Sequence, residues 1–336
     1  MSCILNISRF LIPNDVITTL TNIYKYIGRT PSYEETVGND LSRIIDQTLE
    51  RDCYFLSKIL NLEISDSRLR LIITKHSEPR SKDESTLFYI KEILKSFQMS
   101  YSDLTTQSND LNNLVNYIYP NQNIKFDFDH IDKKAYLRSQ SMRSKRILLD
   151  EINDEVNKHI AKDNFETIVL SLHYFVDFYN LEPFTAHNDV VAYLLLYLLL
   201  LKASVLSYQY VSFFELLYSE FGAFEIELKN ASFNWKEGFS QTNGFIRFMT
   251  KLILNSYIRT NEIINEYKFD ANLNKSNNIE NTISKLPAIF TKDEIRLIHP
   301  YVSESTINRT LSKLRDEKLI KPLGKGRSAK WIKIKA

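Results

Sequence analysis

The chain has 336 residues, of which 43% are hydrophobic, so it can bury a large core and form one large and one small domain, or two to three domains. It contains only 7 glycines and 8 prolines, fewer than sheet-rich folds with many tight turns need, which favours a mainly α-helical protein. The formal net charge of +2 is unevenly distributed, because residues 301–336 carry ten Lys or Arg against three Asp or Glu. This basic end on a mildly acidic body predicts that only the end binds a polyanion.

The chain contains two cysteines, Cys3 and Cys53, and no Cys-x-x-Cys pair, which excludes a disulfide framework. The first residues lack a basic region and a small-residue cleavage site, so we expect no signal peptide and a location in the reducing cytoplasm. The histidines show no metal-ligand spacing with the cysteines or with one another, so the sequence predicts no metal site. It also contains no recognisable phosphate-binding glycine loop or Ser-His-Asp arrangement.

Residues 1–110 are predicted to form an N-terminal helical region. Apolar residues recur at helical spacing over 39–62 and 84–98, and the polar segment 63–84 between them is expected to be loop with a short helical piece. Residues 122–138 alternate in part between apolar and polar side chains, which predicts a short strand or hairpin.

Three helices are predicted in the middle of the chain. The first spans about 142–160, and Asn164 is expected to cap the second, which is apolar nearly all round. A loop at 181–189 then leads into the third helix, at 190–206.

The uncharged run at 190–201 is too short for a membrane span, which needs about 20 residues. A helix that is apolar on every face otherwise lies at the centre of a large helical domain, and we expect no membrane contact. Residues 208–265 predict further helices. The polar, Asn-rich segment 268–282 is interpreted as a linker.

The segment LHYFVDFYNLEPFTAHNDVVAYLLLYLLLLKA, from Leu172, resembles the central unit of Fic domains, in which the signature HPFxDGNGRxxR joins two apolar helices. Pro183, Phe184 and Asn188 match the signature. The later segments YVSFFELLYSEFGAF and NGFIRFMTKLILNSY are also similar to helices of the family. The resemblance implies a Fic-like helical core at 111–267 with a short β-hairpin, in a helical fold that begins near residue 45.

The remaining signature positions differ in this chain. The family's general-base histidine, acidic metal ligand, two glycines and two arginines are replaced by Glu182, Ala186, His187, Asp189, Val190 and Tyr193, respectively. Glycine allows positive φ and close approach of a phosphate, arginine binds phosphate in bidentate fashion, and a carboxylate holds magnesium. The sequence therefore predicts a catalytically degenerate domain, a pseudoenzyme that needs no cofactor.

Simpler interpretations of single residues also stand. His187 is then a loop histidine, and Glu182 a loop carboxylate with no catalytic task. Pro183 and Phe184 form a turn and a core plug. His173, on the apolar helix, is a core histidine with satisfied hydrogen bonds rather than a ligand.

Residues 283–336 have the pattern of a separate small domain. Leu286, Ile289 and Phe290 are expected to form an apolar helical patch, and Thr291 with Glu294 forms a capping box that opens a helix ended by Pro300. Ser303 or Ser305 is expected to cap the next helix, on which Ile307, Leu311 and Leu314 face inward. A glycine-bearing turn and a strand at 331–334 follow.

This order resembles winged helix-turn-helix domains of bacterial regulators, which many Fic-like proteins carry at their C-terminus. The resemblance implies that the second helix of the turn enters the DNA major groove and that the wing contacts the backbone or minor groove. The residues expected to contact DNA are Ser305, Thr306, Asn308, Arg309, Ser312, Lys313, Lys325, Arg327 and Lys330. The alternative is a protein-docking module whose lysines are a solvated face.

The leading hypothesis is a cytoplasmic DNA-binding transcriptional regulator whose degenerate Fic-like domain dimerises or senses a ligand. One alternative is a divergent Fic-type adenylyltransferase that moves AMP from ATP, with magnesium, onto a protein hydroxyl, with Glu182 or His187 as base. Another is a protein-interaction scaffold without enzymatic activity. A regulator with a single winged helix binds weakly, so a homodimer is expected in the first case.

Overall fold

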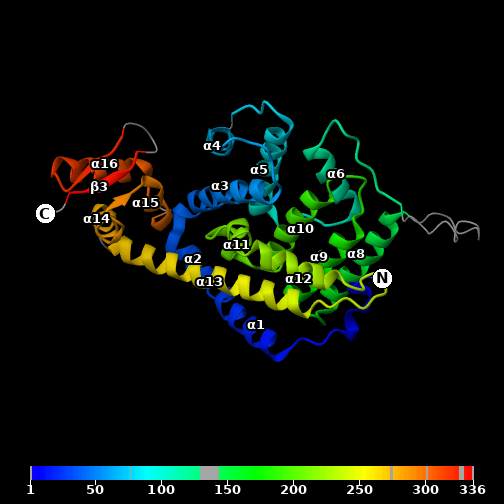
Figure 1. The fold of residues 1–336 in the computed structure, drawn as a ribbon. Coiled ribbons are helices and arrows are strands. Elements are labelled where there is room, and N and C mark those ends of the chain that lie inside the picture. The colour runs from blue at the N-terminus through cyan, green and yellow to red at the C-terminus, as the bar shows by residue number, and fades with distance from the viewer. Residues whose placement is uncertain are drawn as a thin grey trace, which may run out of the picture. The chain divides into compact units, whose positions relative to one another are not determined.

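The computed structural model describes residues 2–75, 77–128, 144–272, 275–299, 302–324 and 329–334. The chain is mainly helical, and three short strands form one antiparallel sheet, which confirms the predicted fold class (Figure 1). Contacts divide it into a body (Met1–Gly28 and Thr48–Tyr257) and a C-terminal unit (Arg29–Gln47 and Ile258–Ala336). Residues 29–47, which lie within the predicted N-terminal helical region 1–110, group with the end of the chain.

The body is built from helices. In chain order they are η1 (Ile4–Arg9), α1 (Asn14–Ile27), α3 (Leu41–Ile59), α4 (Asp66–Lys75), α5 (Lys82–Ser100), α6 (Ser108–Ile118), α8 (Lys145–Lys162), α9 (Thr167–Leu181), α10 (Asn188–Lys202), η3 (Leu206–Gln209), α11 (Phe213–Ser219), α12 (Phe221–Ser232) and α13 (Asn243–Asn272). The first residues of α3 and the last of α13 belong to the C-terminal unit.

Most predicted helices of the body are present. Those at 39–62, 84–98 and 142–160 correspond to α3, α5 and α8, and the short helical piece expected within 63–84 is the ten-residue helix α4. In the predicted strand or hairpin, Phe126 and Phe128 form isolated β-bridges with Phe184 and Ser144. The rest of that segment, 129–143, lies outside the described residues.

The prediction that Asn164 caps the second central helix is wrong. The N-cap of α9 is Glu166, whose carboxylate accepts hydrogen bonds from the backbone amides of Ile168 and Val169 at 3.0 and 2.6 Å. Asn164 instead lies 2.9 Å from the ring of His159 at the end of α8. The Glu166 carboxylate therefore caps the positive end of the helix in place of the Asn164 side chain, because the helix begins later than the apolar pattern suggested.

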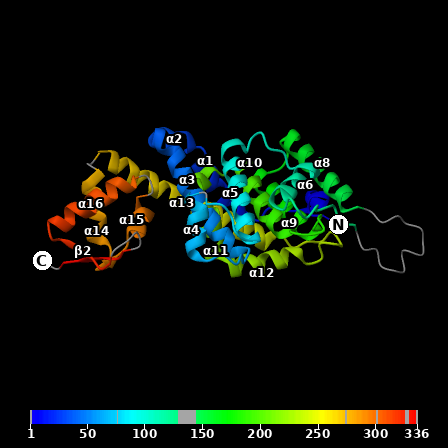
Figure 2. The ribbon, with the colours of Figure 1, turned by 90° about the horizontal axis from the view of Figure 1, so that it is seen from above.

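The core of the body lies around α9 and α10, which pack against each other (Figures 1 and 2). Both helices are buried on almost every face, and the uncharged run at 190–201 lies inside α10. This confirms the prediction of a central buried helix. None of the helices formed by the described residues has both the length and the apolar character needed to cross a bilayer.

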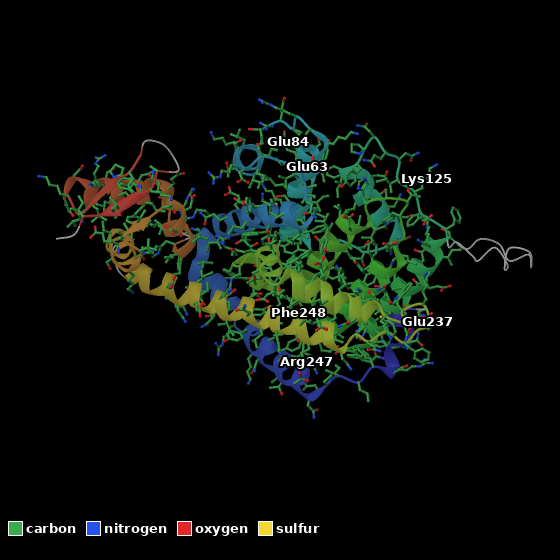
Figure 3. The ribbon with its side chains drawn as sticks, viewed as in Figure 1. Glu63, Glu84, Lys125, Glu237, Arg247 and Phe248 are labelled. Carbon is green, nitrogen blue, oxygen red and sulfur yellow. The ribbon has the colours of Figure 1, made fainter. Side chains whose placement is uncertain are left out.

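Ion pairs join peripheral helices of the body. Arg68 on α4 pairs with Glu84 on α5 at 2.7 Å, and Arg247 on α13 pairs with Asp15 on α1 at 2.5 Å. Figure 3 labels one residue of each pair, Glu84 and Arg247. The Arg68 side chain and a backbone amide hold the pKa of Glu84 at about 2. The exposed pair of Arg247 and Asp15 is expected to stabilise the fold only slightly.

Two buried carboxylates connect distant parts of the body. Asp177 on α9 accepts hydrogen bonds from the Ser2 hydroxyl, the Cys3 and Ile4 amides and the Trp235 indole, at 2.5 to 2.9 Å. This carboxylate fixes the start of the chain and the loop after α12 against the central helix.

Asp52 on α3 plays the same part on another side of the core. It accepts hydrogen bonds from the Ser212 hydroxyl and the Phe214 amide at the start of α11, at 2.7 and 2.9 Å, and from the Tyr197 hydroxyl of α10 at 3.3 Å. Burial raises the pKa of Asp52 to about 7, although these hydrogen bonds oppose the rise.

The C-terminal unit contains α2 (Thr30–Val37), η2 (Gly38–Asp40), α14 (Lys275–Lys285), β1 (Ile289–Phe290), α15 (Lys292–Ile298), α16 (Glu304–Asp316), β2 (Ile320–Pro322) and β3 (Trp331–Lys333). The strand order is β1-β3-β2, with both pairings antiparallel. Helices α14 and α16 pack together (Figure 2). The segment interpreted as a linker, 268–282, is helical at both ends, since α13 continues to Asn272 and α14 begins at Lys275.

The predicted helical patch at 286–290 is wrong, because Ile289 and Phe290 form β1 and pair with Ile332 and Trp331. Pro287 disfavours a helical backbone at the residue before it, so α14 ends at Lys285 and the chain is extended.

The caps of the next two helices follow the sequence. The capping box of Thr291 and Glu294 is present, and Ser303 is the N-cap of α16, which confirms one of the two expected residues. The apolar stripe of α16 is buried as predicted, at Ile307, Leu311 and Leu314. Pro300 lies outside the described residues.

We expect Asp177→Ala to lower the free energy of unfolding by about 3 to 5 kcal/mol, because four buried donors lose their acceptor. Chemical denaturation of the full chain measures the loss. The exposed Asp154→Ala on α8 serves as control and should change stability little. A loss below about 1 kcal/mol for Asp177→Ala would contradict this role.

The raised pKa of Asp52 also predicts a pH dependence. The folded chain holds the proton of Asp52 up to about pH 7, whereas the unfolded chain releases it near the ordinary pKa of 3.8. The stabilisation of the folded state by this proton is therefore complete below pH 3.8, decreases as pH rises and is lost above pH 7. Between pH 5 and 8 the wild type should lose about 2 to 3 kcal/mol relative to Asp52→Asn. Denaturation curves of both proteins at both pH values test this. An equal change in the free energy of unfolding between pH 5 and 8 for the two proteins would contradict it.

Candidate functional site

The loop that resembles the Fic signature joins α9 to α10. Glu182 ends α9 with φ of 44°, and His187 precedes α10 with φ of 58°, so both occupy the left-handed region. Residues other than glycine adopt this conformation at a cost, which the surrounding contacts must offset.

The signature residues that this chain keeps hold the loop together. The Phe184 amide donates to the Asn188 side chain at 2.9 Å, and the Asn188 side chain donates to the Phe184 carbonyl at 2.7 Å. Phe184 is buried between the rings of Phe126 and Phe178. Pro183 is also buried, and its carbonyl accepts from the Asp127 amide at 2.8 Å. These contacts agree with the interpretation of a turn and a core plug.

Packing and one polar contact fix the ring of His187. Its ring stacks on Tyr119 with centroids 3.6 Å apart and an angle of 10°, and its Nε2 lies 2.8 Å from the Gln122 side chain. Burial lowers the pKa of His187, and the nearby Asp189 opposes this only in part. The geometry fits a structural loop histidine whose stacking compensates for the left-handed backbone.

The start of α10 is not arranged to receive an anion. A helix N-terminus favours negative charge, but here Asp189 supplies that charge from the first turn. Val190 is buried and Ala186 is half-buried, and neither bears a group that holds phosphate or metal. Lys145 reaches the loop, yet its ammonium donates to the Glu182 carbonyl at 3.1 Å and pairs with Asp127 at 3.0 Å.

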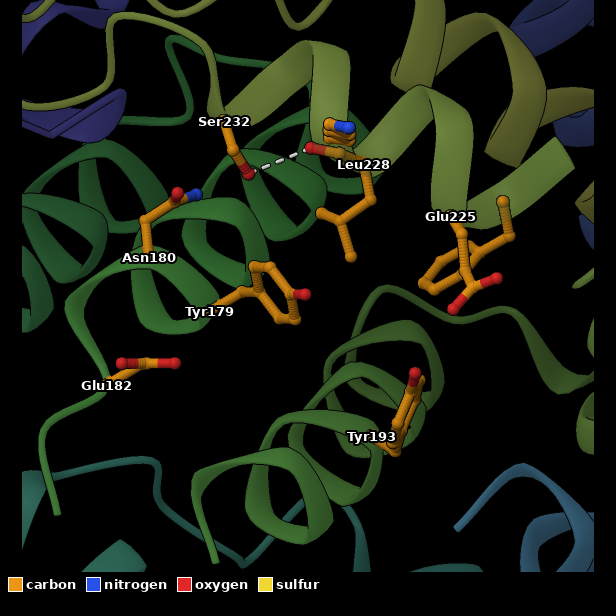
Figure 4. Close-up of a pocket in the computed structure, with 9 residues that line it drawn as sticks. Tyr179, Asn180, Glu182, Tyr193, Glu225, Leu228 and Ser232 are labelled. Atoms are coloured by element: carbon orange, nitrogen blue, oxygen red, sulfur yellow. Dashed lines mark hydrogen bonds between the residues drawn. The ribbon is translucent and has the colours of Figure 1, made fainter. Parts of the chain in front are cut away.

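A cavity of about 510 Å³ lies beside Glu182, between α9, α10 and α12. Figure 4 shows Tyr179, Glu182, Tyr193 and Glu225 around this space. The remaining lining residues are Asn180, Phe224, Leu228, Lys229 and Ser232.

The phenols of this cavity lie in a negative environment. Burial raises the pKa of Tyr179, and the carboxylates of Glu182, Glu225 and Asp189 raise it further. The pKa of Tyr193 is raised by burial first, and then by Tyr179, Glu225 and Asp189. Both tyrosines therefore remain protonated at neutral pH and offer hydroxyl groups and ring faces.

Sequence reasoning missed this cavity. In the sequence, Tyr193 only stands where the family has an arginine, and Tyr179 and Glu225 belong to no motif. No spacing in the sequence could indicate the site, because α12 brings Glu225 to it from a distant part of the chain.

His173 is a buried core histidine, as interpreted. Its Nδ1 lies 2.8 Å from the Val169 carbonyl and its Nε2 lies 3.1 Å from the Thr242 hydroxyl, and burial lowers its pKa to about 4. Within the described part of the chain, no group of three or more His, Cys, Asp or Glu side chains could hold a metal ion.

The residues expected to contact DNA occupy different environments on α16. Ser305 and Arg309 are exposed, whereas the remaining polar positions Thr306, Asn308 and Ser312 are half-buried. Lys313 is exposed, but its ammonium pairs with Glu280 of α14 at 2.8 Å. This pair, which sequence reasoning missed, neutralises part of the expected positive surface.

The hairpin expected to form the wing is described in part. Lys330 is exposed, and its carbonyl accepts from the Leu323 amide at 2.8 Å, which closes the hairpin of β2 and β3. Lys325 and Arg327 lie outside the described residues, so their contacts stay predictions. Lys333 on β3 donates to the Ser284 and Leu286 carbonyls at the end of α14, and it therefore has a structural task.

No family model matches the sequence, and no curated protein matches it either. The structure is similar to that of a Fic family protein from Desulfovibrio desulfuricans G20, with 10% identity and a TM-score of 0.52 over 97% of each chain. It is also similar to a Fic domain containing signaling protein from Bacteroides thetaiotaomicron VPI-5482, with 15% identity and a TM-score of 0.54 over 74% of this chain and 98% of that one. The protein therefore has the fold of Fic family proteins.

Proposed function

We propose that this protein is a DNA-binding transcriptional regulator. Its C-terminal unit binds DNA as a winged helix-turn-helix, and its Fic-like body has lost nucleotide transfer and senses a ligand or dimerises.

The arrangement of α14 to β3 is the observation that carries the DNA-binding part. Helix, strand, helix, helix and two further strands follow one another, and the strands form one antiparallel sheet in the order β1-β3-β2. This is the order of elements in a winged helix, in which α16 is the helix that enters the major groove.

The surface of α16 supports the same proposal. Its buried stripe fixes the helix against the unit and leaves Ser305 and Arg309 exposed in its first half, where a recognition helix contacts bases and phosphates. The net charge of +7 over residues 301–336 supplies the attraction to a polyanion.

The loop between α9 and α10 supports the loss of transfer. Transfer of a nucleotide needs a cradle for phosphates, and this loop places the carboxylate of Asp189 at the helix start and engages Lys145 in other contacts. The side chain of His187 is stacked on Tyr119, which leaves it unsuited to act as a base.

DNA binding tests the first part. Arg309→Ala should weaken binding of the full chain about tenfold at low salt and reduce the salt slope by about one. Lys313→Ala is the matched comparison on the same helix, and it should cost less because Glu280 already pairs with that ammonium. Fluorescence anisotropy with labelled duplexes at several salt concentrations measures both, and absence of binding at low salt would refute the proposal.

Incubation with labelled ATP and magnesium tests the second part. We expect no labelled protein above the background of the Glu182→Ala/His187→Ala double variant. Labelling by the wild type that the double variant loses would show an active site at this loop and would contradict the proposal.

A further inference from the structure

The cavity beside Glu182 has the size of a small-molecule site. At about 510 Å³ it lies within the range of roughly 300 to 1,000 Å³ typical of ligand pockets. All its lining residues belong to the body, between Tyr179 and Ser232, so it does not depend on the C-terminal unit.

The charged groups of the cavity favour a cation. Glu182 and Glu225 line it, and Asp189 lies near enough to raise the pKa of both tyrosines. Lys229 is the opposing charge among the lining residues, so the two lining carboxylates leave an excess of one negative charge.

The walls of the cavity favour an organic cation over a metal ion. Tyr179 and Tyr193 present aromatic rings, and Phe224 and Leu228 form a buried apolar floor. Aromatic faces attract ammonium groups, and this attraction is strongest where water is partly excluded. Hard metal ions instead require several converging oxygen ligands.

We propose that this cavity binds an organic ammonium cation, with its charged group against the ring faces of Tyr179 and Tyr193, where the Glu182 and Glu225 carboxylates attract it, and its alkyl part against the apolar floor. This identifies the chemical class of the ligand for the sensing role proposed above, and it rests on that part of the proposed function alone.

Isothermal titration calorimetry on the full chain without DNA tests the proposal, with butylammonium, 1-butanol and butyrate as matched probes. Butylammonium should bind at least tenfold tighter than the other two. The Glu182→Gln/Glu225→Gln double variant should lose at least tenfold in affinity for butylammonium. The exposed Glu237→Gln serves as control and should bind as the wild type does.

Tyr193 provides a second, independent readout. Tyr193→Phe keeps the ring and should change the affinity less than twofold, whereas Tyr193→Leu removes the aromatic face and should weaken binding several-fold. Thermal unfolding of each variant identifies those that fail to fold. Equal binding of the three probes, no binding of butylammonium, or full affinity in a folded double glutamine variant would overturn the proposal.

Two sources of the cation are distinguished by a further pair of probes. Tighter binding of Nα-acetyl-lysine methylamide than of 1,4-diaminobutane would identify a lysine side chain of a protein, and the reverse order a free amine. The assay contains no DNA, so failure here leaves DNA binding by α16 intact, and failure of DNA binding leaves this result unaffected.

Discussion

The body depends on one constraint: α9 and α10 pass through its core almost without a face toward solvent. Every polar group on such helices must find a partner inside the protein. His173 and Asp177 on α9 and Tyr197 on α10 do so with groups from remote segments, including the start of the chain and the loop after α12. The two helices therefore organise the outer helices through hydrogen bonds as well as through apolar packing.

The same constraint explains which residues of the loop match the signature. Pro183, Phe184 and Asn188 close the connection between two buried helices, so replacing them would disturb the core. The side chains of Glu182 and Asp189 are exposed instead, and Tyr193 lines the cavity. The loop residues that match the signature are thus the ones on which the packing of the two helices depends.

Sequence reasoning succeeded where the signal is local. Uninterrupted apolar character predicted α10, and the Thr291 capping box and the buried stripe of α16 follow from spacing within one helix. It failed where contacts between segments distant in the sequence determine the structure. Ile289 and Phe290 become a strand only because β3 pairs with them, and the cavity and the pair of Lys313 with Glu280 need elements far apart in the chain.

The pair of Lys313 with Glu280 affects how many counterions this surface can displace from DNA. When a protein binds DNA, its cationic groups displace the small ions condensed around the phosphates, and this gain in entropy drives association. An ammonium that is already paired with an internal carboxylate displaces fewer of these ions, because the internal ion pair must break before the ammonium can contact a phosphate. In the proposed DNA complex Glu280 would thus compete with the phosphates for Lys313, so the number of basic residues overstates the positive charge that this surface offers.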